Sequence, residues 1–250
     1  MAASISDIRL LLRVKSLPKS AESRRVFITG GTGYIGSSLI PILIERDHRV
    51  RVMVRPGSKA KLPAACEVVS GDALDANSYR KLIRPADTFI HLVGVPHPSA
   101  AKATQFQTID LVSAREAIDA CAEVGMHHFI YLSVAHPAPM RMRQAYIAVR
   151  SECEQMIQDR HLSSTIFRPW YVLGPGHRWP TLLLPFYKVC EWLPFTRASA
   201  RRLGLVTLEQ LILALVEAVE SPAQGTRIVE VPEIRASGLN QARELTRKSA

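Results

Sequence analysis

From Arg25 onward, short apolar runs rich in β-branched residues alternate with longer segments whose apolar residues recur at helical spacing. The first kind of run predicts a buried strand and the second predicts a helix. The predicted strands are Val26–Thr29, Arg49–Val54, Cys66–Ser70, Thr88–Val93, Phe129–Ser133, Thr165–Arg168 and Arg227–Val231. The predicted helices are Tyr34–Arg46, Ala103–Val124 and Ala145–Arg160. Strands that alternate with helices in this way predict an α/β fold, a parallel sheet covered by helices on both faces.

The alternation of strands and helices stops at both ends of the chain. We expect an N-terminal extension over residues 1–24, one doubly wound domain over 25–234 and a basic C-terminal tail over 235–250. Within the domain, the Gly- and Pro-rich start of 174–204 predicts a small segment on the substrate side. A length of 250 residues fits one such domain, although length alone leaves two small domains open.

The formal net charge of +10 is concentrated at the chain ends. Such ends are most often simply solvated, and contact with an anionic membrane surface stays open as the alternative. No basic stripe with interleaved aromatics indicates a nucleic-acid partner. No apolar run reaches the ~20 residues that a membrane span needs.

The four cysteines form no C-x-x-C pair, and the histidines show no ligand spacing, so we expect no metal site. A cytoplasmic location fits this cysteine usage. The extreme N-terminus lacks the features of a secretory signal. It reads as an ordinary extension, with an organellar transit peptide as the less favoured alternative.

The strongest local motif is the glycine-rich turn from Thr29 to Gly36, which follows a predicted strand and opens a predicted helix. Gly30 permits a tight turn, Gly33 lets the backbone approach a pyrophosphate, and Gly36 lets the helix pack closely on the sheet. The helix N-terminus offers free N–H groups and partial positive charge to phosphates. The turn therefore predicts a bound dinucleotide.

The residue at the end of the second predicted strand indicates which dinucleotide is bound. An acid there would accept from the 2′-hydroxyl of NAD(H), whereas this chain has Arg55, followed by Lys59 and Lys61. A cation suits the 2′-phosphate of NADP(H). NADP(H) is therefore favoured over NAD(H).

Together with this turn, four further segments resemble the extended or atypical branch of the short-chain dehydrogenase/reductase superfamily, often described as epimerase/dehydratase-like. They are Gly71–Asp75, Phe89–Gly94, Phe129–Ser133 and Phe167–Gly176, and the resemblance covers residues 25–232. It implies a Rossmann fold and an NAD(P)-dependent activity. The cofactor-binding residues that the turn, Arg55 and the resemblance together predict are Thr29, Gly30, Thr32, Gly33, Tyr34, Ile35, Gly36, Arg55, Asp72, Ala73, Leu92, Val93, Gly94, Pro169 and Val172.

The chain departs from the family at its catalytic helix. The family uses Tyr-x-x-x-Lys, whereas this chain has Tyr146 and Arg150, which share one helix face at a spacing of four. The resemblance implies that Tyr146 exchanges the proton, that Arg150 favours its deprotonated form, and that Ser133 binds the substrate oxygen. Because arginine is larger, planar and permanently charged, its geometry differs from that of lysine.

The sequence leaves two functions open. The first is an oxidoreductase or epimerase-like enzyme that transfers hydride between NADP(H) and a small molecule. An apolar substrate is favoured by aromatics that cluster near the predicted substrate segment, namely Trp170, Tyr171, Trp179, Phe186, Tyr187, Trp192 and Phe195, although these side chains could equally cap the core. The second is a non-catalytic sensor or accessory protein that holds the dinucleotide without turnover. The oligomeric state is left open.

Overall fold

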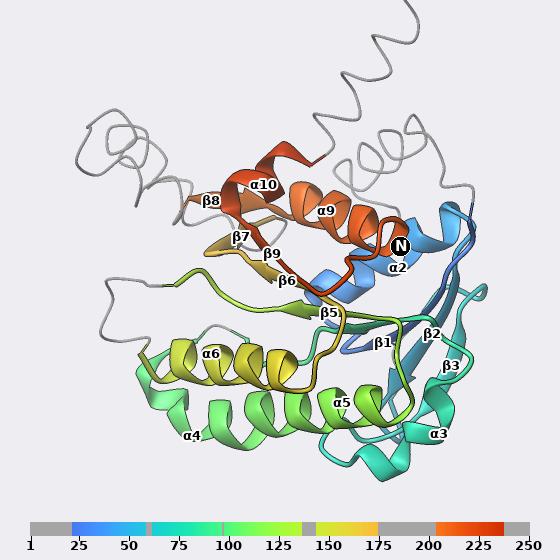
Figure 1. Ribbon diagram of the computed structural model, residues 1–250, viewed down its shortest axis with the longest axis horizontal. Coiled ribbons are helices and arrows are strands. Elements are labelled where there is room, and N and C mark those ends of the chain that lie inside the picture. The colour runs from blue at the N-terminus through green and yellow to red at the C-terminus, as the bar shows by residue number, and fades with distance from the viewer. Residues whose placement is uncertain (1–21, 59–61, 97, 137–143, 175–203, 238–250) are drawn as a thin grey trace, which may run out of the picture.

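A computed structural model describes residues 22–58, 62–96, 98–136, 144–174 and 204–237 (Figure 1). Its centre is a parallel sheet of seven strands in the order β3-β2-β1-β4-β5-β6-β9. This order is the doubly wound arrangement, in which the chain reverses direction across the sheet between β1 and β4. The strands are β1 (Arg25–Thr29), β2 (Arg49–Val54), β3 (Glu67–Ser70), β4 (Thr88–His91), β5 (His128–Leu132), β6 (Ser164–Arg168) and β9 (Thr226–Glu230).

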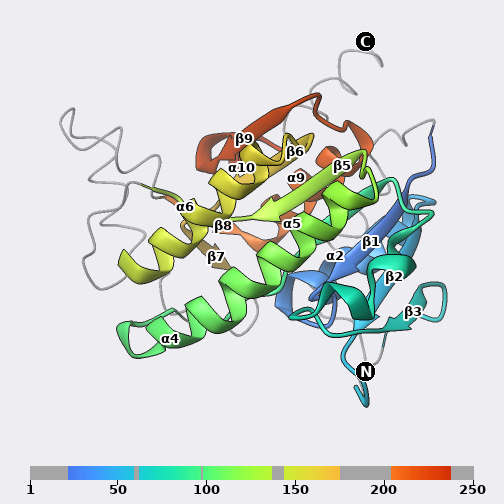
Figure 2. The ribbon, with the colours of Figure 1, turned by 60° about the horizontal axis from the view of Figure 1, so that its bottom comes forward.

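Helices cover both faces of the sheet, as the sequence pattern predicted (Figures 1 and 2). One face carries α2 (Tyr34–Glu45) and α9 (Leu208–Glu220), and the other carries α5 (Val112–Glu123) and α6 (Gln144–Asp159). The short helices are α3 (Arg80–Ile83), α4 (Ala103–Gln105) and α10 (Val231–Ala236), with single turns η1 (Ala76–Ser78) and η2 (Ala100–Lys102).

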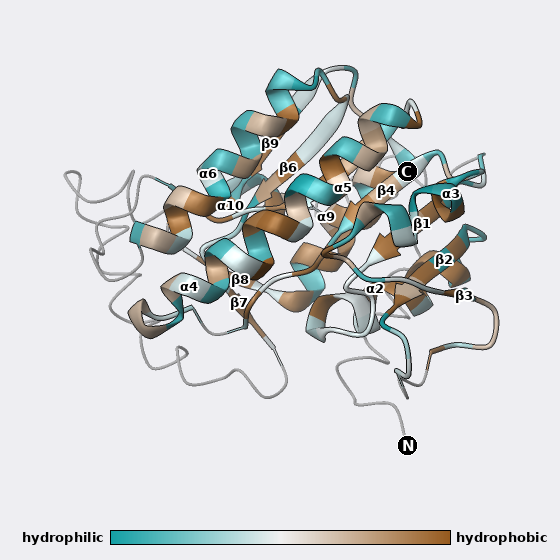
Figure 3. Cartoon of the chain, turned by 90° about the horizontal axis from the view of Figure 1, so that it is seen from below, coloured by the Kyte–Doolittle hydropathy of each residue, from teal (hydrophilic) through white to brown (hydrophobic). Residues whose placement is uncertain are grey.

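Alternation along the strands decides which side chain enters which core layer. Val26 and Ile28 pack with α2 and α9, whereas Phe27 points to the layer under α5 and α6. There the rings of Phe27, Phe89 and Phe129 stack across three neighbouring strands, with centroids 5.2 and 5.6 Å apart. Helices α5 and α6 carry hydrophilic and hydrophobic residues in alternation, as expected for helices with one buried face (Figure 3).

The structure departs from the predicted elements in two places. The single helix expected over Ala103–Val124 contains a π-helical segment, η3 (Phe106–Leu111), between α4 and α5. Helix α9 and the small parallel pair β7 (Tyr171–Leu173) and β8 (Leu205–Thr207) were not predicted. Helix α9 is amphipathic, because its apolar residues are buried while its polar residues Glu209, Gln210, Glu217 and Glu220 are half-buried. Its helical pattern was therefore present in the sequence and was missed. Most of 174–204 and both terminal segments lie outside the described residues.

Candidate functional site

The glycine-rich turn connects β1 to α2 at the carboxyl edge of the sheet. Gly30 adopts a φ of +74°, a conformation that L-residues with side chains rarely adopt. Gly33 is the N-cap of α2, and its amide donates to the Gly30 carbonyl oxygen at 3.0 Å. The chain therefore turns tightly at the end of β1, and the N-terminus of α2 lies at the carboxyl edge of the sheet.

A Cβ at Gly30 or Gly36 would collide with neighbouring backbone, whereas one at Gly33 would not. At Gly30 the Cβ would lie 2.6 Å from the backbone of Leu92, and at Gly36 it would lie 2.5 Å from the Cα of Gly31. Both glycines are thus required by packing, and Gly36 packs against the turn itself rather than on the sheet as expected. At Gly33 the Cβ would meet only the Gly30 carbonyl oxygen, at 3.2 Å. Its missing side chain leaves space open to a cavity.

That cavity has a volume of about 850 Å³ and extends from the glycine turn to α6 and the ends of β5 and β6. This volume lies within the range of small-molecule and cofactor sites. The predicted residues that line it are Gly30, Gly33, Tyr34, Ile35, Gly36, Leu92, Val93, Gly94, Ser133, Tyr146, Arg150, Pro169 and Val172. Trp170 and Tyr171, which belong to the aromatic cluster of the sequence analysis, also line it. The lining residues that were not predicted are Val95, Pro96, Pro98, Ser99, Leu132 and Val134.

The other predicted cofactor residues, Thr29, Thr32, Arg55, Asp72 and Ala73, lie outside the cavity lining. Thr29 is buried below the turn, where its Oγ1 lies 2.9 Å from Nδ1 of His91. Arg55 is exposed just beyond the end of β2. Asp72 is also exposed, and its Oδ1 accepts a hydrogen bond from the Leu74 amide at 3.0 Å.

Arg150 reaches the cavity wall from α6 and is almost fully buried. Its Nη1 donates to the Tyr131 hydroxyl at 3.1 Å and to the Leu132 carbonyl oxygen at 3.0 Å, and its Nη2 donates to Asp110. Its guanidinium lies over the ring of Tyr146, with the central carbon 5.0 Å from the ring centroid. Arg150 therefore faces the ring of Tyr146, and the hydrogen bonds described for its terminal nitrogens go to other groups.

Asp110 is the counter-ion of Arg150, and the sequence analysis missed it. It projects from η3, is fully buried, and also accepts from the Val95 amide at 3.0 Å. Burial raises the pKa of Asp110, and the Arg150 charge opposes that rise. Gly94 makes room for the pair, since a Cβ there would lie 2.5 Å from Nη2 of Arg150. The sequence did carry a signal for it, because Asp110 is an acidic residue on the apolar face of the predicted helix, with Phe106 one turn before it and Ala114 one turn after it.

Ser133 lines the cavity just beyond β5, and its hydroxyl donates to Glu154 of α6. Arg168 donates to both Glu154 oxygens, and His136 lies 3.3 Å from one of them. The sequence analysis missed Glu154 as well. It lies four residues after Arg150 and eight after Tyr146, so all three share one helix face.

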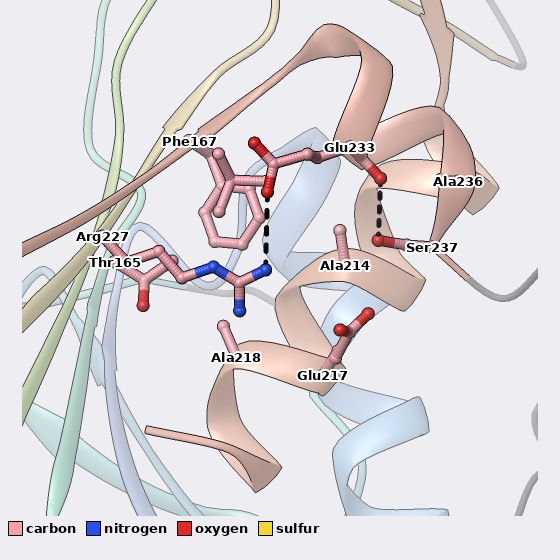
Figure 4. A pocket seen from close by; sticks show the side chains of 10 residues that line it. Thr165, Phe167, Ala214, Glu217, Ala218, Arg227, Glu233, Ala236 and Ser237 are labelled. Carbon is pink, nitrogen blue, oxygen red and sulfur yellow. Dashed lines mark hydrogen bonds and ion pairs between the residues drawn. The ribbon is translucent and has the colours of Figure 1, made fainter. Parts of the chain in front are cut away.

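A second cavity, of about 110 Å³, lies among β6, β9, α9 and α10 (Figure 4). Two contacts join residues of its lining: Arg227 is 3.5 Å from Glu233, and the Ser237 hydroxyl donates to the Glu233 carbonyl oxygen at 3.2 Å (Figure 4). This space is far too small for a dinucleotide.

In the part of the chain that the structure describes, no three or more His, Cys, Asp or Glu side chains are grouped so that they could hold a metal ion. No helix among the described residues is both long and apolar enough to cross a membrane.

Comparison with known proteins places this site in a family. The family model described as NAD(P)H-binding matches residues 30–177. The chain is 27% identical over 217 residues to a ceramide reductase of Caulobacter vibrioides, and the match covers 85% of this chain and 66% of that protein. It is 25% identical over 130 residues to a 3 beta-hydroxysteroid dehydrogenase/Delta 5-->4-isomerase of Mycobacterium tuberculosis, with 50% and 35% covered. The chain thus spans less than two thirds of the length of either curated relative.

Among solved structures, the fold resembles that of the Bordetella bronchiseptica enzyme WbmH in complex with NAD+. The TM-score is 0.64 at 22% sequence identity, and the match covers 84% of this chain and 76% of that one. The Rossmann fold that the motifs predicted is confirmed.

Proposed function

We propose that this chain, which belongs to the NAD(P)H-binding family, is an NADP(H)-dependent oxidoreductase of the epimerase/dehydratase-like branch of the short-chain dehydrogenase/reductase superfamily. The observation that carries this proposal is one shared cavity, which the glycine turn lines on one side and Ser133, Tyr146 and Arg150 line on the other. A cofactor and a reacting group held by those two sides would meet in the same space.

The residues around the turn fit a dinucleotide. The open side of Gly33 and the start of α2 would hold the pyrophosphate, as the N-termini of such helices commonly do. Leu92, Val93 and Gly94 would lie along the ribose, and Pro169 and Val172 beside the nicotinamide, which supplies or accepts a hydride when bound. The exposed Arg55 at the end of β2 supports a preference for the 2′-phosphate of NADP(H).

Tyr146 would serve as the acid or base of the reaction. Its ring packs against Phe106, with centroids 5.1 Å apart, and against the Arg150 guanidinium, so its position on the cavity wall is fixed. A fixed phenol that lines the cavity can exchange a proton with a substrate oxygen. Arg150 would favour the deprotonated form through its charge, and Ser133 would form a hydrogen bond with the same substrate oxygen when that oxygen is a hydroxyl.

An apolar substrate is supported by the walls beyond the glycine turn. Val95, Pro96, Pro98 and Trp170 line the cavity there, and none of these four side chains carries a charge. The two curated relatives named above carry ceramide and a hydroxysteroid in their names, and both of these are lipids. The predicted aromatic residues from 179 to 195 lie outside the described residues.

Replacing Tyr146 by Phe tests the hypothesis that the protein is an enzyme that uses this tyrosine as its acid or base. In a screen of ketones, enones and quinones with NADPH, we expect turnover by the unmutated protein and a loss of about 10²–10⁴-fold in Tyr146→Phe, because general acid–base catalysis contributes that much. NADPH affinity, followed by fluorescence, should change little. Arg150→Lys should retain activity as the matched variant. Full activity of Tyr146→Phe would exclude this mechanism.

A non-catalytic, dinucleotide-holding protein is the second candidate. It is favoured by the contacts of Arg150, whose terminal nitrogens donate to Asp110, Tyr131 and the Leu132 carbonyl oxygen rather than to the Tyr146 hydroxyl. In that case the screen would show no turnover while NADPH still binds.

A further inference from the structure

The Ser133 hydroxyl lies at the cavity wall, yet its proton is already engaged. Its Oγ donates to Oε1 of Glu154, and both residues are only 4% exposed. A hydroxyl has one proton and two lone pairs, and a carboxylate can only accept hydrogen bonds. While this bond exists, Ser133 can offer the cavity only its lone pairs.

The Glu154 carboxylate is itself held in place. Nε of Arg168 lies 3.1 Å from Oε1 and 3.2 Å from Oε2, and Nη2 of the same side chain donates to Oε2. Charge-assisted bonds from one guanidinium to both oxygens fix the plane of a carboxylate as well as its position. Glu154 is therefore not free to turn away from Ser133.

We propose that Glu154 is a positioning residue that keeps Ser133 a hydrogen-bond acceptor, so that the site selects ligands presenting a hydroxyl donor. This inference rests on the proposed function for the choice of ligand, but the direction of the Ser133 proton does not depend on it. A substrate alcohol would accept from the Tyr146 hydroxyl and donate to Ser133. A substrate carbonyl, which can only accept, would take its hydrogen bond from Tyr146.

His136 provides a matched comparison. Its Nε2 lies 3.3 and 3.4 Å from the two Glu154 oxygens, on a side chain that is 21% exposed. No hydrogen bond between His136 and Ser133 occurs among the described residues. Replacing His136 therefore disturbs the same carboxylate without altering the partner of the Ser133 proton.

Neutron diffraction from deuterium-exchanged crystals of the cofactor-free protein tests the direction of the proton. We expect the Ser133 deuteron between Oγ and Oε1 of Glu154, with no deuteron on the carboxylate. A deuteron that points from Oγ into the cavity, or one carried by Glu154, would overturn the inference. This result does not require a substrate or turnover, so it is separate from the test of the proposed function.

Binding of cyclohexanol and cyclohexanone to the cofactor-free protein tests the selection of ligands, because neither probe can react there. By titration in saturation-transfer NMR we expect cyclohexanol to bind about tenfold more tightly, the value of one additional hydrogen bond. In Glu154→Gln the amide can donate to Ser133 and release its proton, so the preference should disappear, whereas His136→Gln should keep it. Equal or tighter binding of cyclohexanone by the unmutated protein would overturn the selection. If Glu154→Gln fails to fold, the unmutated protein and the neutron map still decide the inference.

Discussion

The two walls of the cavity are built on different principles. The wall at the glycine turn owes its shape to the backbone, where missing side chains allow a reversal at Gly30 and leave space at Gly33. The wall at α6 owes its shape to buried charges, with Arg150 held by Asp110, and Glu154 held by Arg168. The shape of the first wall is determined by one short stretch of sequence, whereas the second wall depends on ion pairs between residues that only the fold brings together.

The largest expected effect removes the function of the first wall without removing its fold. Gly33 has a φ of −77°, which any residue adopts, so Gly33→Val should fold. Its side chain would occupy the space beside the turn, so we expect dinucleotide binding to be lost. Calorimetric titration with NADPH measures this, and Ser37→Val, an exposed change on α2, is the control. Unchanged affinity in Gly33→Val would place the phosphates elsewhere.

The next effect tests the second wall. Asp110→Ala leaves the buried Arg150 cation without its counter-ion, so the free energy of unfolding should fall by about 3–5 kcal/mol. Urea denaturation measures this. The control is Asp119→Ala, which breaks a 2.7 Å pair with Arg160 whose side chains are 30% and 55% exposed. Exposed pairs contribute at most about 1 kcal/mol. Equal losses in the two variants would show that Arg150 does not depend on Asp110.

A smaller effect concerns which dinucleotide the first wall prefers. We expect NADPH to bind more tightly than NADH, and Arg55→Ala to weaken NADPH binding by about 1.5–3 kcal/mol through loss of one charge-assisted bond. NADH affinity should hardly change. Arg49→Ala, at the opposite end of the same strand and also exposed, is the control. Equal NADPH and NADH affinities in the unmutated protein would remove the case for NADP(H).

The smallest effect per unit of pH concerns His91, which is buried below the glycine turn beside Thr29. Burial, followed by the Arg150 charge, lowers the pKa of His91 to about 3. In the unfolded chain histidine titrates near pH ~6.5, so between about pH 6 and 4 only the unfolded state binds this proton. The free energy of unfolding should therefore fall by about 1.4 kcal/mol per pH unit on account of His91. His91→Gln should remove that slope, and the exposed His127→Gln should keep it. Urea denaturation across this pH range measures both, and an unchanged slope in His91→Gln would show that His91 is protonated in the folded protein.

The difference between the walls also explains what could be predicted from the sequence. The seven strands of the main sheet, three of the helices and the glycine turn were predictable because each is specified by neighbouring residues. The roles of Asp110 and Glu154 were not predictable, because each depends on an ion pair with an arginine elsewhere in the chain. Arg150 is forty residues from Asp110, and a helical period cannot reveal that the two side chains form a buried ion pair. Helix α9 was missed although its pattern was present, since its polar residues are separated from its buried apolar residues and Thr207 and Gln210 form a capping box at its start.

The close approach of Gly94, Asp110 and Arg150 also restricts how this chain can evolve. A Cβ at position 94 would collide with the guanidinium, and loss of the acid would leave a cation buried alone. Most single replacements at these three positions should therefore be selected against, even where a double replacement would be tolerated. We expect the three positions to co-vary among descendants of this lineage, because a replacement at one of them is tolerated only with a matching replacement at another.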